Sequence, residues 1–393
     1  MSNRFAILGL SIAAVLAAPA MALAQTQLNG QKIAVTTAVP FLRISPDARS
    51  GAMGDVGIAI SADANAQYWN VAKIPFAQKK YGVSATYTPW LKDLVPDINL
   101  VYVSGYAKFG ENDNQAISAS LRYFSLGNIN YTNITGDPIG TGMPREYSFD
   151  MGYSRRLSPN LSLGANLRYI HSALATGAAN SGDYKPGNAF AGDMGIYYTR
   201  TTEKNEFESS TFSAGAVLSN IGSKIAYSST RRDFIPTNLG LGAAYTYKVD
   251  AYNKITIAAD VNKLLVPAPK DTSSVAGDPK YAYPNDGVVA GVFSSFGDPA
   301  GIKRVNASVG GEYWYQDQFA VRAGYYYEHK DNGDRRYFTC GVGVRYTVFN
   351  LNVAYLVPSG SGITRNPLSN TVRFSLLFDF NSGADFNKSN NAE

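Results

Sequence analysis

Apolar residues occupy every second position in a series of ten-residue stretches that begins near residue 80. In one of them, Tyr147, Phe149, Met151 and Tyr153 alternate with small or polar residues. Because successive side chains of a β-strand point to opposite faces, each such strand has one apolar face and one small or polar face. Strands of this length and pattern are typical of a transmembrane barrel, in which one face meets lipid and the other the lumen. The sequence therefore predicts an all-β, transmembrane antiparallel β-barrel.

The number of strands follows from counting these stretches. Fourteen candidates start near residues 80, 98, 115, 146, 161, 188, 210, 237, 254, 304, 318, 336, 350 and 370. Short and long connections alternate between them, which is typical of short periplasmic turns and long extracellular loops. Asn128 to Tyr131 lies inside a long connection, and we interpret it as a loop extension rather than a fifteenth strand. About fourteen strands are expected, with both chain ends on the periplasmic side.

The first 24 residues indicate export. Met1 to Arg4 is a short positive region, Phe5 to Ala18 is apolar, and Ala22-Leu23-Ala24 resembles a signal-peptidase site. We expect a signal peptide over residues 1–24 and a location in the Gram-negative outer membrane. The lone cysteine, Cys340, has no partner for an internal disulfide. It shares the outward phase of its strand, so we expect it to face lipid.

The remaining boundaries follow from where the alternation starts and stops. Residues 25–79 lack it, and fourteen strands enclose more space than their own side chains fill, so we expect these residues to form an N-terminal plug in the barrel lumen. The barrel is expected over residues 80–380 and a periplasmic tail over residues 381–393. The composition fits, because 27 Tyr and 37 Gly beside a charged fraction of 17% suit aromatic girdles and a crowded lumen. A net charge of +5 is too small to indicate nucleic-acid binding.

The predicted plug carries the most specific motif, which runs from Pro40 to Asp55 and from Ser61 to Lys73. Its candidate site residues, with a structural or gating role, are Pro46, Asp47, Arg49, Gly54, Asp55, Asp63, Asn65, Trp69 and Asn70. Together with later segments such as Asp260 to Pro267, the motif resembles the PorV family, outer-membrane shuttle proteins of the type IX secretion system within the FadL-like barrel superfamily. The family has Asn-Pro-Ala where this chain has Asn70-Val71-Ala72, which leaves the turn at that point open.

The resemblance implies an outer membrane of the Bacteroidetes type and the function of a cargo shuttle. Such a shuttle binds the C-terminal domain of translocated cargo at the translocon barrel and passes it to a surface attachment complex with a sortase-like protease. Its other partner is outer-membrane lipid. The resemblance implies no cofactor and no catalysis. One alternative is a FadL-like transporter of hydrophobic small molecules, which would need a continuous apolar pocket past the plug. A less favoured alternative is a lipid A deacylase.

The charged residues of the plug allow two interpretations. Asp47, Arg49, Asp55 and Asp63 could gate the lumen or contact a partner. They could also pair with lumen groups such as Arg122, Arg168 and Arg322 and hold the plug in place. We favour pairing, since charges sheltered from water need partners whatever the protein does.

The longest connection contains an apolar stretch, Gly287 to Phe296, that could form a short helix. Val292, Phe293 and Phe296 are candidate residues for docking a partner protein, or for covering the barrel mouth. The two histidines, His171 and His329, are better explained as loop residues than as catalytic ones, because no nucleophile and acid accompany them in a triad pattern. We predict no catalytic and no metal site.

Overall fold

A computed structural model of the chain describes residues 37–90, 97–174, 184–229, 232–267, 270–271, 281–282, 287–297, 304–329, 333, 335–358 and 371–381. Residues 34–393 form one compact unit. The predicted signal peptide, the first part of the predicted plug and residues 382–393 of the predicted tail lie outside the described residues.

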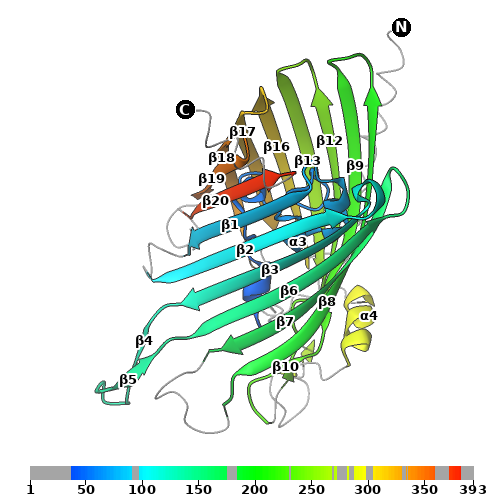
Figure 1. Cartoon of the computed structure of the whole chain (residues 1–393). Coiled ribbons are helices and arrows are strands. Elements are labelled where there is room, and N and C mark those ends of the chain that lie inside the picture. The colour runs from blue at the N-terminus through cyan, green and yellow to red at the C-terminus, as the bar shows by residue number, and fades with distance from the viewer. Residues whose placement is uncertain are drawn as a thin grey trace, which may run out of the picture. The chain divides into compact units, whose positions relative to one another are not determined.

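Fourteen antiparallel strands form a closed barrel, shown in Figure 1. In barrel order they are β1 (Tyr81–Pro89), β2 (Ile98–Phe109), β3 (Gln115–Leu126), β6 (Arg145–Arg156), β7 (Leu161–Ala173), β8 (Gly187–Glu203), β9 (Ser209–Gly222), β12 (Asn238–Lys248), β13 (Asn253–Leu264), β16 (Val305–Tyr315), β17 (Phe319–Glu328), β18 (Arg336–Tyr346), β19 (Phe349–Pro358) and β20 (Val372–Phe380). Pairing of β1 with β20 closes the barrel, so the wall has no free strand edge. Each strand starts within two residues of its predicted position, and the predicted fold class is confirmed.

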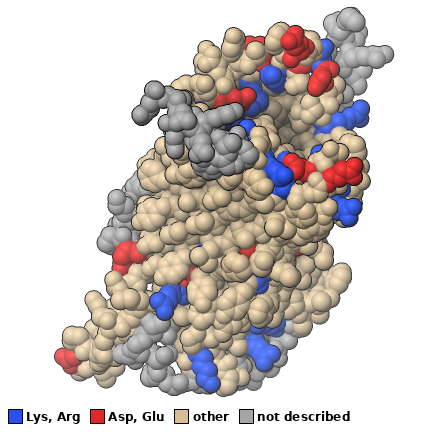
Figure 2. All heavy atoms as spheres, viewed as in Figure 1, with Lys and Arg blue, Asp and Glu red and all other residues tan. Residues whose placement is uncertain are grey.

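The two faces of each strand differ as the alternation predicts. Met151 is 60% exposed and points outward, whereas its neighbour Asp150 is 2% exposed and points into the barrel. Cys340 is exposed in phase with Phe338 and Val342, as expected. On the face seen in Figure 2, most charged side chains lie toward the two ends, and a belt with few of them lies between. Among the described residues no helix is long and apolar enough to cross a membrane.

The two ends of the barrel differ in their connections. At one end, the short-turn end, turns such as residues 249–252 join neighbouring strands, and the 3-10 helix η3 (Glu111–Asp113) lies in one of them. The other end, the long-loop end, carries three two-stranded sheets and helix α4 (Figure 1). These elements are β4 (Ile129–Thr132) with β5 (Pro138–Gly142), β10 (Ile225–Ala226) with β11 (Arg232–Asp233), β14 (Lys270–Asp271) with β15 (Tyr281–Ala282), and α4 (Val288–Gly297). The alternation of long and short connections agrees with the strand count.

Residues 37–80, here called the N-terminal segment, lie among the inward-facing side chains of the strands. They form η1 (Pro40–Arg43), α2 (Ala48–Gly51), α3 (Ala66–Trp69) and η2 (Val71–Phe76). Figure 1 shows these short helices behind the strands of the wall. The segment starts near the long-loop end, where Phe41 packs against Phe124, and reaches the short-turn end, where Lys108 Nζ donates to the Ala77 carbonyl at 2.7 Å.

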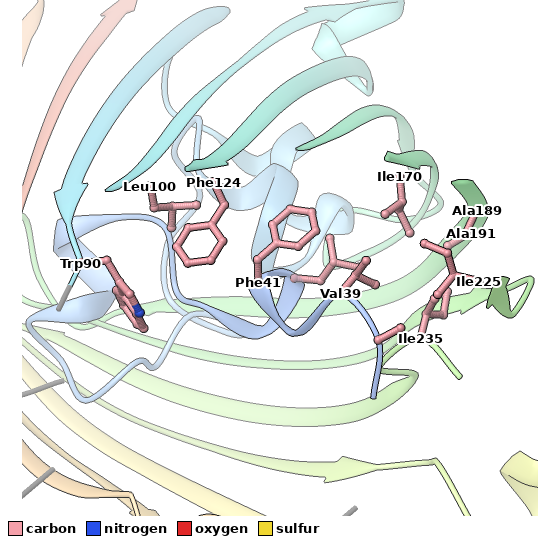
Figure 3. Packing of buried hydrophobic residues seen from close by; sticks show 12 residues of the cluster. Val39, Phe41, Trp90, Leu100, Phe124, Ile170, Ala189, Ala191, Ile225 and Ile235 are labelled. Atoms are coloured by element: carbon pink, nitrogen blue, oxygen red, sulfur yellow. The ribbon is translucent and has the colours of Figure 1, made fainter. Parts of the chain in front are cut away.

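The largest apolar cluster joins the start of the N-terminal segment to the wall. Val39 and Phe41 are fully buried against residues from several strands and loops, among them Leu100, Ile170 and Ile225 (Figure 3). Phe41 and Phe124 stack with ring centroids 6.4 Å apart. Burying a side chain of this kind stabilises the folded state by about 1.5–3 kcal/mol, so this cluster fixes one end of the segment.

Candidate functional site

Arg49 is the centre of the contact between the N-terminal segment and the wall. Its Nε and Nη2 atoms donate to the two carboxylate oxygens of Glu312 at 3.0 and 2.9 Å. Its Nη1 atom donates to Asp63 at 3.1 Å, within the segment itself. Glu312 also accepts from Arg322 Nε at 2.7 Å. Two carboxylates and two guanidinium groups therefore form one buried network, in which no member is left without a partner of opposite charge.

Asp47 organises the segment around helix α2. Its carboxylate accepts from the Ser50 backbone N–H at 2.8 Å as an N-cap, and from Trp69 Nε1 at 2.6 Å. Burial, followed by the nearby charge of Asp63, raises the pKa of Asp47 above its ordinary value. The cap begins α2, while the indole bond ties α3 to it. Pro46, the residue before this cap, is buried as well.

Gly54 and Asp55 form a left-handed turn against strands β17 and β18, with φ values of +72° and +62°. A Cβ on Gly54 would come within 2.6 Å of the Tyr325 backbone nitrogen, so only glycine fits this approach. The Asp55 carboxylate accepts from Tyr337 Oη at 2.6 Å and from Arg373 Nη1 at 2.8 Å. The turn is thereby fixed to the wall from two strands.

The Asn70 side chain stabilises the turn at Val71, where the family motif has proline. Its side chain accepts from the Ala72 N–H at 3.1 Å and caps helix η2, and it donates to the Ile196 carbonyl at 3.1 Å. Val71 is the first residue of that helix, a position where proline is also favoured. The turn therefore forms with valine in place of proline. Asn65, the residue before α3, donates its backbone N–H to Asp63 Oδ1 at 2.9 Å.

The pairing interpretation of the charged residues agrees with these contacts, but the named partners were wrong. Arg168 pairs with Asp150 and Asp193 of the wall, and Arg322 pairs with Glu312. Arg122 donates to the carbonyls of Phe41 and Leu42 and lies over the Tyr68 ring at 4.4 Å. The aspartates Asp55 and Asp63 pair instead with Arg373 and Arg49. In the barrel lumen, residues far apart in sequence meet one another. The phase of a strand shows which residues point inward, but not which of them form pairs.

Two cavities lie on opposite sides of the N-terminal segment. The cavity toward the long-loop end has a volume of about 110 Å³ and is lined by residues such as Tyr68, Asn238 and Asn306. The cavity toward the short-turn end has a volume of about 510 Å³ and is lined by residues such as Thr211 and Lys254. The two share no lining residue. Both cavities are lined by charged, polar and apolar side chains.

Helix α4 presents the predicted docking residues. Gly291 and Ser295 are buried, and a Cβ on Gly291 would lie 2.9 Å from the Phe234 ring, so the helix rests closely on that residue. Phe293 is 72% and Phe296 54% exposed. Val292 is half-buried, while the 68% exposed Val289 shares the outer face with the two phenylalanines. Residues 289, 293 and 296 are spaced by four and three positions, so they form one apolar ridge.

The β4–β5 hairpin is a second projecting surface, and the sequence pattern did not predict it as a separate element. Strands β4 and β5 form a hairpin beyond β3 and β6, whereas the sequence indicated a plain loop extension at Asn128 to Tyr131. At its tip Asn133 Oδ1 accepts from the Thr135 and Asp137 N–H groups at 3.0 and 2.8 Å. Ile134 is fully exposed there. The Asn-x-Thr-Gly-Asp sequence of this turn was the available signal.

The two histidines lie in different surroundings. His171 lies in strand β7 rather than in a loop, where Nδ1 is 2.8 Å from Asn188 Oδ1 and the ring stacks on Tyr147. His329 follows the end of β17 and is half-buried. Among described residues, no group of three His, Cys, Asp or Glu side chains could hold a metal ion.

The closed antiparallel barrel, apolar outside and with a polar-anchored N-terminal segment inside, is the architecture of an outer-membrane β-barrel protein. The family model described as "Type IX secretion system protein PorV" matches residues 27–271. The chain belongs to this family, whose members are outer-membrane components of type IX secretion.

The chain is similar to several solved structures. The Pseudomonas putida toluene transporter TodX matches with a TM-score of 0.50 at 12% identity, covering 85% of this chain and 98% of that chain. The deltaS2S3 mutant of TodX, a monoaromatic hydrocarbon channel, matches with a TM-score of 0.49 at 13% identity, covering 84% and 96%. A Pseudomonas aeruginosa FadL homologue matches with a TM-score of 0.42 at 12% identity, covering 89% and 100%. The comparison with curated proteins found no match.

Proposed function

We propose that this protein binds the C-terminal domain of translocated cargo at its long-loop end and shuttles it from the translocon barrel to the surface attachment complex. Membership of the PorV family supports this proposal. The observation that carries the docking step is the apolar ridge of α4, formed by Val289, Phe293 and Phe296. In this account no bond is made or broken by the barrel itself.

The ridge is suited to a protein partner. An exposed cluster of one aliphatic and two aromatic side chains is disfavoured in water and is typical of an interaction site. A helix that served only to cover the barrel mouth would direct these side chains inward, yet Phe293 and Phe296 point outward while Gly291 faces Phe234. The close approach at Gly291 also holds the helix in place, which reduces the entropy lost on binding.

The N-terminal segment has a separate role in this proposal, that of a plug. Its buried network through Arg49, Asp55 and Asp63 reaches strands β16, β18 and β20. A segment anchored on several strands keeps the lumen divided, so cargo would move with the barrel in the membrane plane and not through it. The predicted signal peptide over residues 1–24 would bring the chain to the outer membrane.

The transporter alternative is less well supported by the lumen. A hydrophobic substrate needs a continuous apolar route past the plug, but the two cavities share no lining residue and both carry charged side chains, such as Arg168 in one and Lys254 in the other. The toluene transport named for TodX belongs to that protein. A deacylase would need a clustered nucleophile and base, and the half-buried His171 has an asparagine and a tyrosine as neighbours.

The test replaces the ridge with serine, as Val289→Ser, Phe293→Ser and Phe296→Ser together. Buried aromatic anchors commonly contribute about 2 kcal/mol each, so affinity for a purified cargo C-terminal domain should fall by well over tenfold. Surface-attached cargo should fall in parallel. The matched control removes similar apolar area at the other projecting surface, as Ile134→Ser with Ile139→Ser. Equal binding by the ridge variant and the wild type would remove α4 as the docking site.

A further inference from the structure

The larger cavity, toward the short-turn end, has a row of hydroxyl groups on its wall. Strands β8, β9, β12 and β13 follow one another in the barrel (Figure 1), and each places one threonine in direct register with the next. These are Thr201, Thr211, Thr246 and Thr256. Thr201 bonds to Thr211 and Thr246 to Thr256, each at 2.8 Å. Since every hydroxyl has one hydrogen, each bonded pair keeps one hydrogen for another acceptor.

Two lysines lie beside this row of hydroxyls. Lys248 and Lys254 are one step nearer the turn of residues 249–252, and they are direct cross-strand partners. Both line the cavity. Like charges directly opposite each other are destabilising, so a counter-charge is needed here. Lys254 has one in Asp317, whereas Lys248 forms no ion pair with a described residue.

Arg345 of strand β18 brings a third cation to the cavity. Its guanidinium lies over the Trp314 ring, with Cζ 4.6 Å from the centroid. Lys254 Nζ lies 5.8 Å from the same centroid, so the two cations are near neighbours. An aromatic ring attracts a cation but has no net charge to neutralise it. Arg345 forms no ion pair with a described residue, so its charge is unbalanced.

The described lining of the cavity carries more unpaired cations than unpaired carboxylates. The unpaired cations are Lys79, Lys248 and Arg345, which are half-buried with accessible side-chain nitrogens, and the unpaired carboxylate is Asp379. The other charged lining residues are joined in ion pairs; they are Arg49, Asp63, Glu312, Lys254 and Asp317. Charges sheltered from water need partners, so this excess favours an anion in the cavity.

We propose that this cavity binds a small anion with two or more phosphate or carboxylate groups, held by Lys248, Arg345 and the neighbouring threonine hydroxyls. Hydrogen bonds from lysine and arginine to such oxygens are charge-assisted and stronger than neutral ones. Lys248 and Arg345 lie on strands β12 and β18, so an anion with two charged groups can contact both. The volume of about 510 Å³ falls within the roughly 300–1,000 Å³ that small-molecule sites occupy. The inference goes beyond cargo docking and does not depend on α4.

Binding is tested by calorimetry on the full-length protein in detergent at low salt. The probes are pyrophosphate and glucose 1,6-bisphosphate in one arm and succinate and citrate in the other, so the two arms distinguish phosphate from carboxylate. At least one anion should saturate a single site with a submillimolar Kd. Because Arg345 lies over the Trp314 ring, tryptophan emission should change with the same Kd.

Variants at the cavity locate the bound anion. Lys248→Met should weaken binding about tenfold or more, since a hydrogen bond to a charged group typically contributes that much, while Lys248→Arg should retain most of the affinity. Thr246→Val keeps the shape and the charge but deletes one hydroxyl, and should weaken binding about threefold. The matched control is Lys204→Met, which removes a lysine from the turn between β8 and β9 that does not line the cavity, and should leave the Kd unchanged.

Three results would overturn the proposal. They are the absence of saturation by every anion, undiminished affinity in Lys248→Met, and an equal loss in Lys248→Met and Lys204→Met, which would show that only the overall charge attracts the anions. Should Lys248→Met fail to fold, Thr246→Val decides, because unchanged affinity in that variant would equally contradict the site. None of these results bears on cargo docking.

Discussion

Arg49 and Glu312 form a buried, two-bond ion pair that joins the N-terminal segment to strand β16. Their side chains are 9% and 2% exposed, and the two N–O distances are 3.0 and 2.9 Å. Arg49 is only 14 residues from its second partner, Asp63, but 263 residues from Glu312. The pair therefore links a local turn to a strand that lies more than 250 residues further along the chain.

Arg49→Met should loosen the segment without unfolding the barrel. Removing one partner of a buried pair typically costs about 3–5 kcal/mol, and here Glu312 keeps Arg322 as a partner, so about 3 kcal/mol is expected. Amide exchange of residues 47–60 should accelerate, and conductance in planar bilayers should rise. Lys204→Met, which removes an exposed ion pair with Glu208 and lines neither cavity, should change neither. Unchanged exchange in the Arg49 variant would contradict the anchoring role.

Substitution by arginine, tested at one position on each face of the wall, distinguishes the lipid face from the lumen face. Met151 is 60% exposed near the middle of β6, so Met151→Arg should cost about 2–4 kcal/mol. Thr211 lines the 510 Å³ cavity, where an arginine can reach water, so Thr211→Arg should cost little. The readout is the yield of folded, heat-modifiable barrel, and equal loss in the two variants would contradict the assigned faces.

Lys73 gives the protein a specific pH dependence. Burial is the largest cause that lowers its pKa, to about 8, although Nζ donates to the Gly57 carbonyl. The native state thus releases this proton before the unfolded chain does, so stability should rise with pH between 8 and the ordinary value near 10.5. Unfolding in detergent should show a gain of about 2 kcal/mol from pH 7.5 to 9.5. Lys73→Met should abolish the gain, and a persistent gain would assign it to another group.

Cys340 should report the position of the membrane. It is exposed on strand β18 in phase with apolar neighbours, so a charged maleimide should react slowly in intact membranes and readily in detergent. Cys340→Ser should assemble normally. Rapid labelling in both conditions would place this part of the strand outside the lipid.

The barrel could be predicted from the sequence because the alternation that defines each strand is visible within that strand alone. A strand with lipid on one side needs apolar residues at alternate positions, so the phase of Met151 and Cys340 was visible without any structure. Counting the alternating stretches gave the strand number, and the alternation of short and long connections agreed with it. Neither observation depends on which residues meet across the lumen.

The contacts of the N-terminal segment could not be predicted in this way. Arg373, the partner of Asp55, lies in the last strand, and strand phase says only that it points inward. Gly152 looked like an ordinary inward position, yet a Cβ there would lie 2.6 Å from Gln67 Oε1. The face that α4 exposes depends on its fit against Phe234, which residues 288–297 alone do not determine.

A photo-crosslinking amino acid at position 293 tests the central claim most directly. In intact outer membranes, a shuttle should crosslink there to cargo C-terminal domains, and the same probe at Ile134 should capture them less. We predict that the probe at position 293 captures cargo, and that this capture is lost when Val289→Ser and Phe296→Ser are introduced as well. Crosslinks at position 293 to lipid alone, while cargo still reaches the surface, would contradict the docking of cargo on α4.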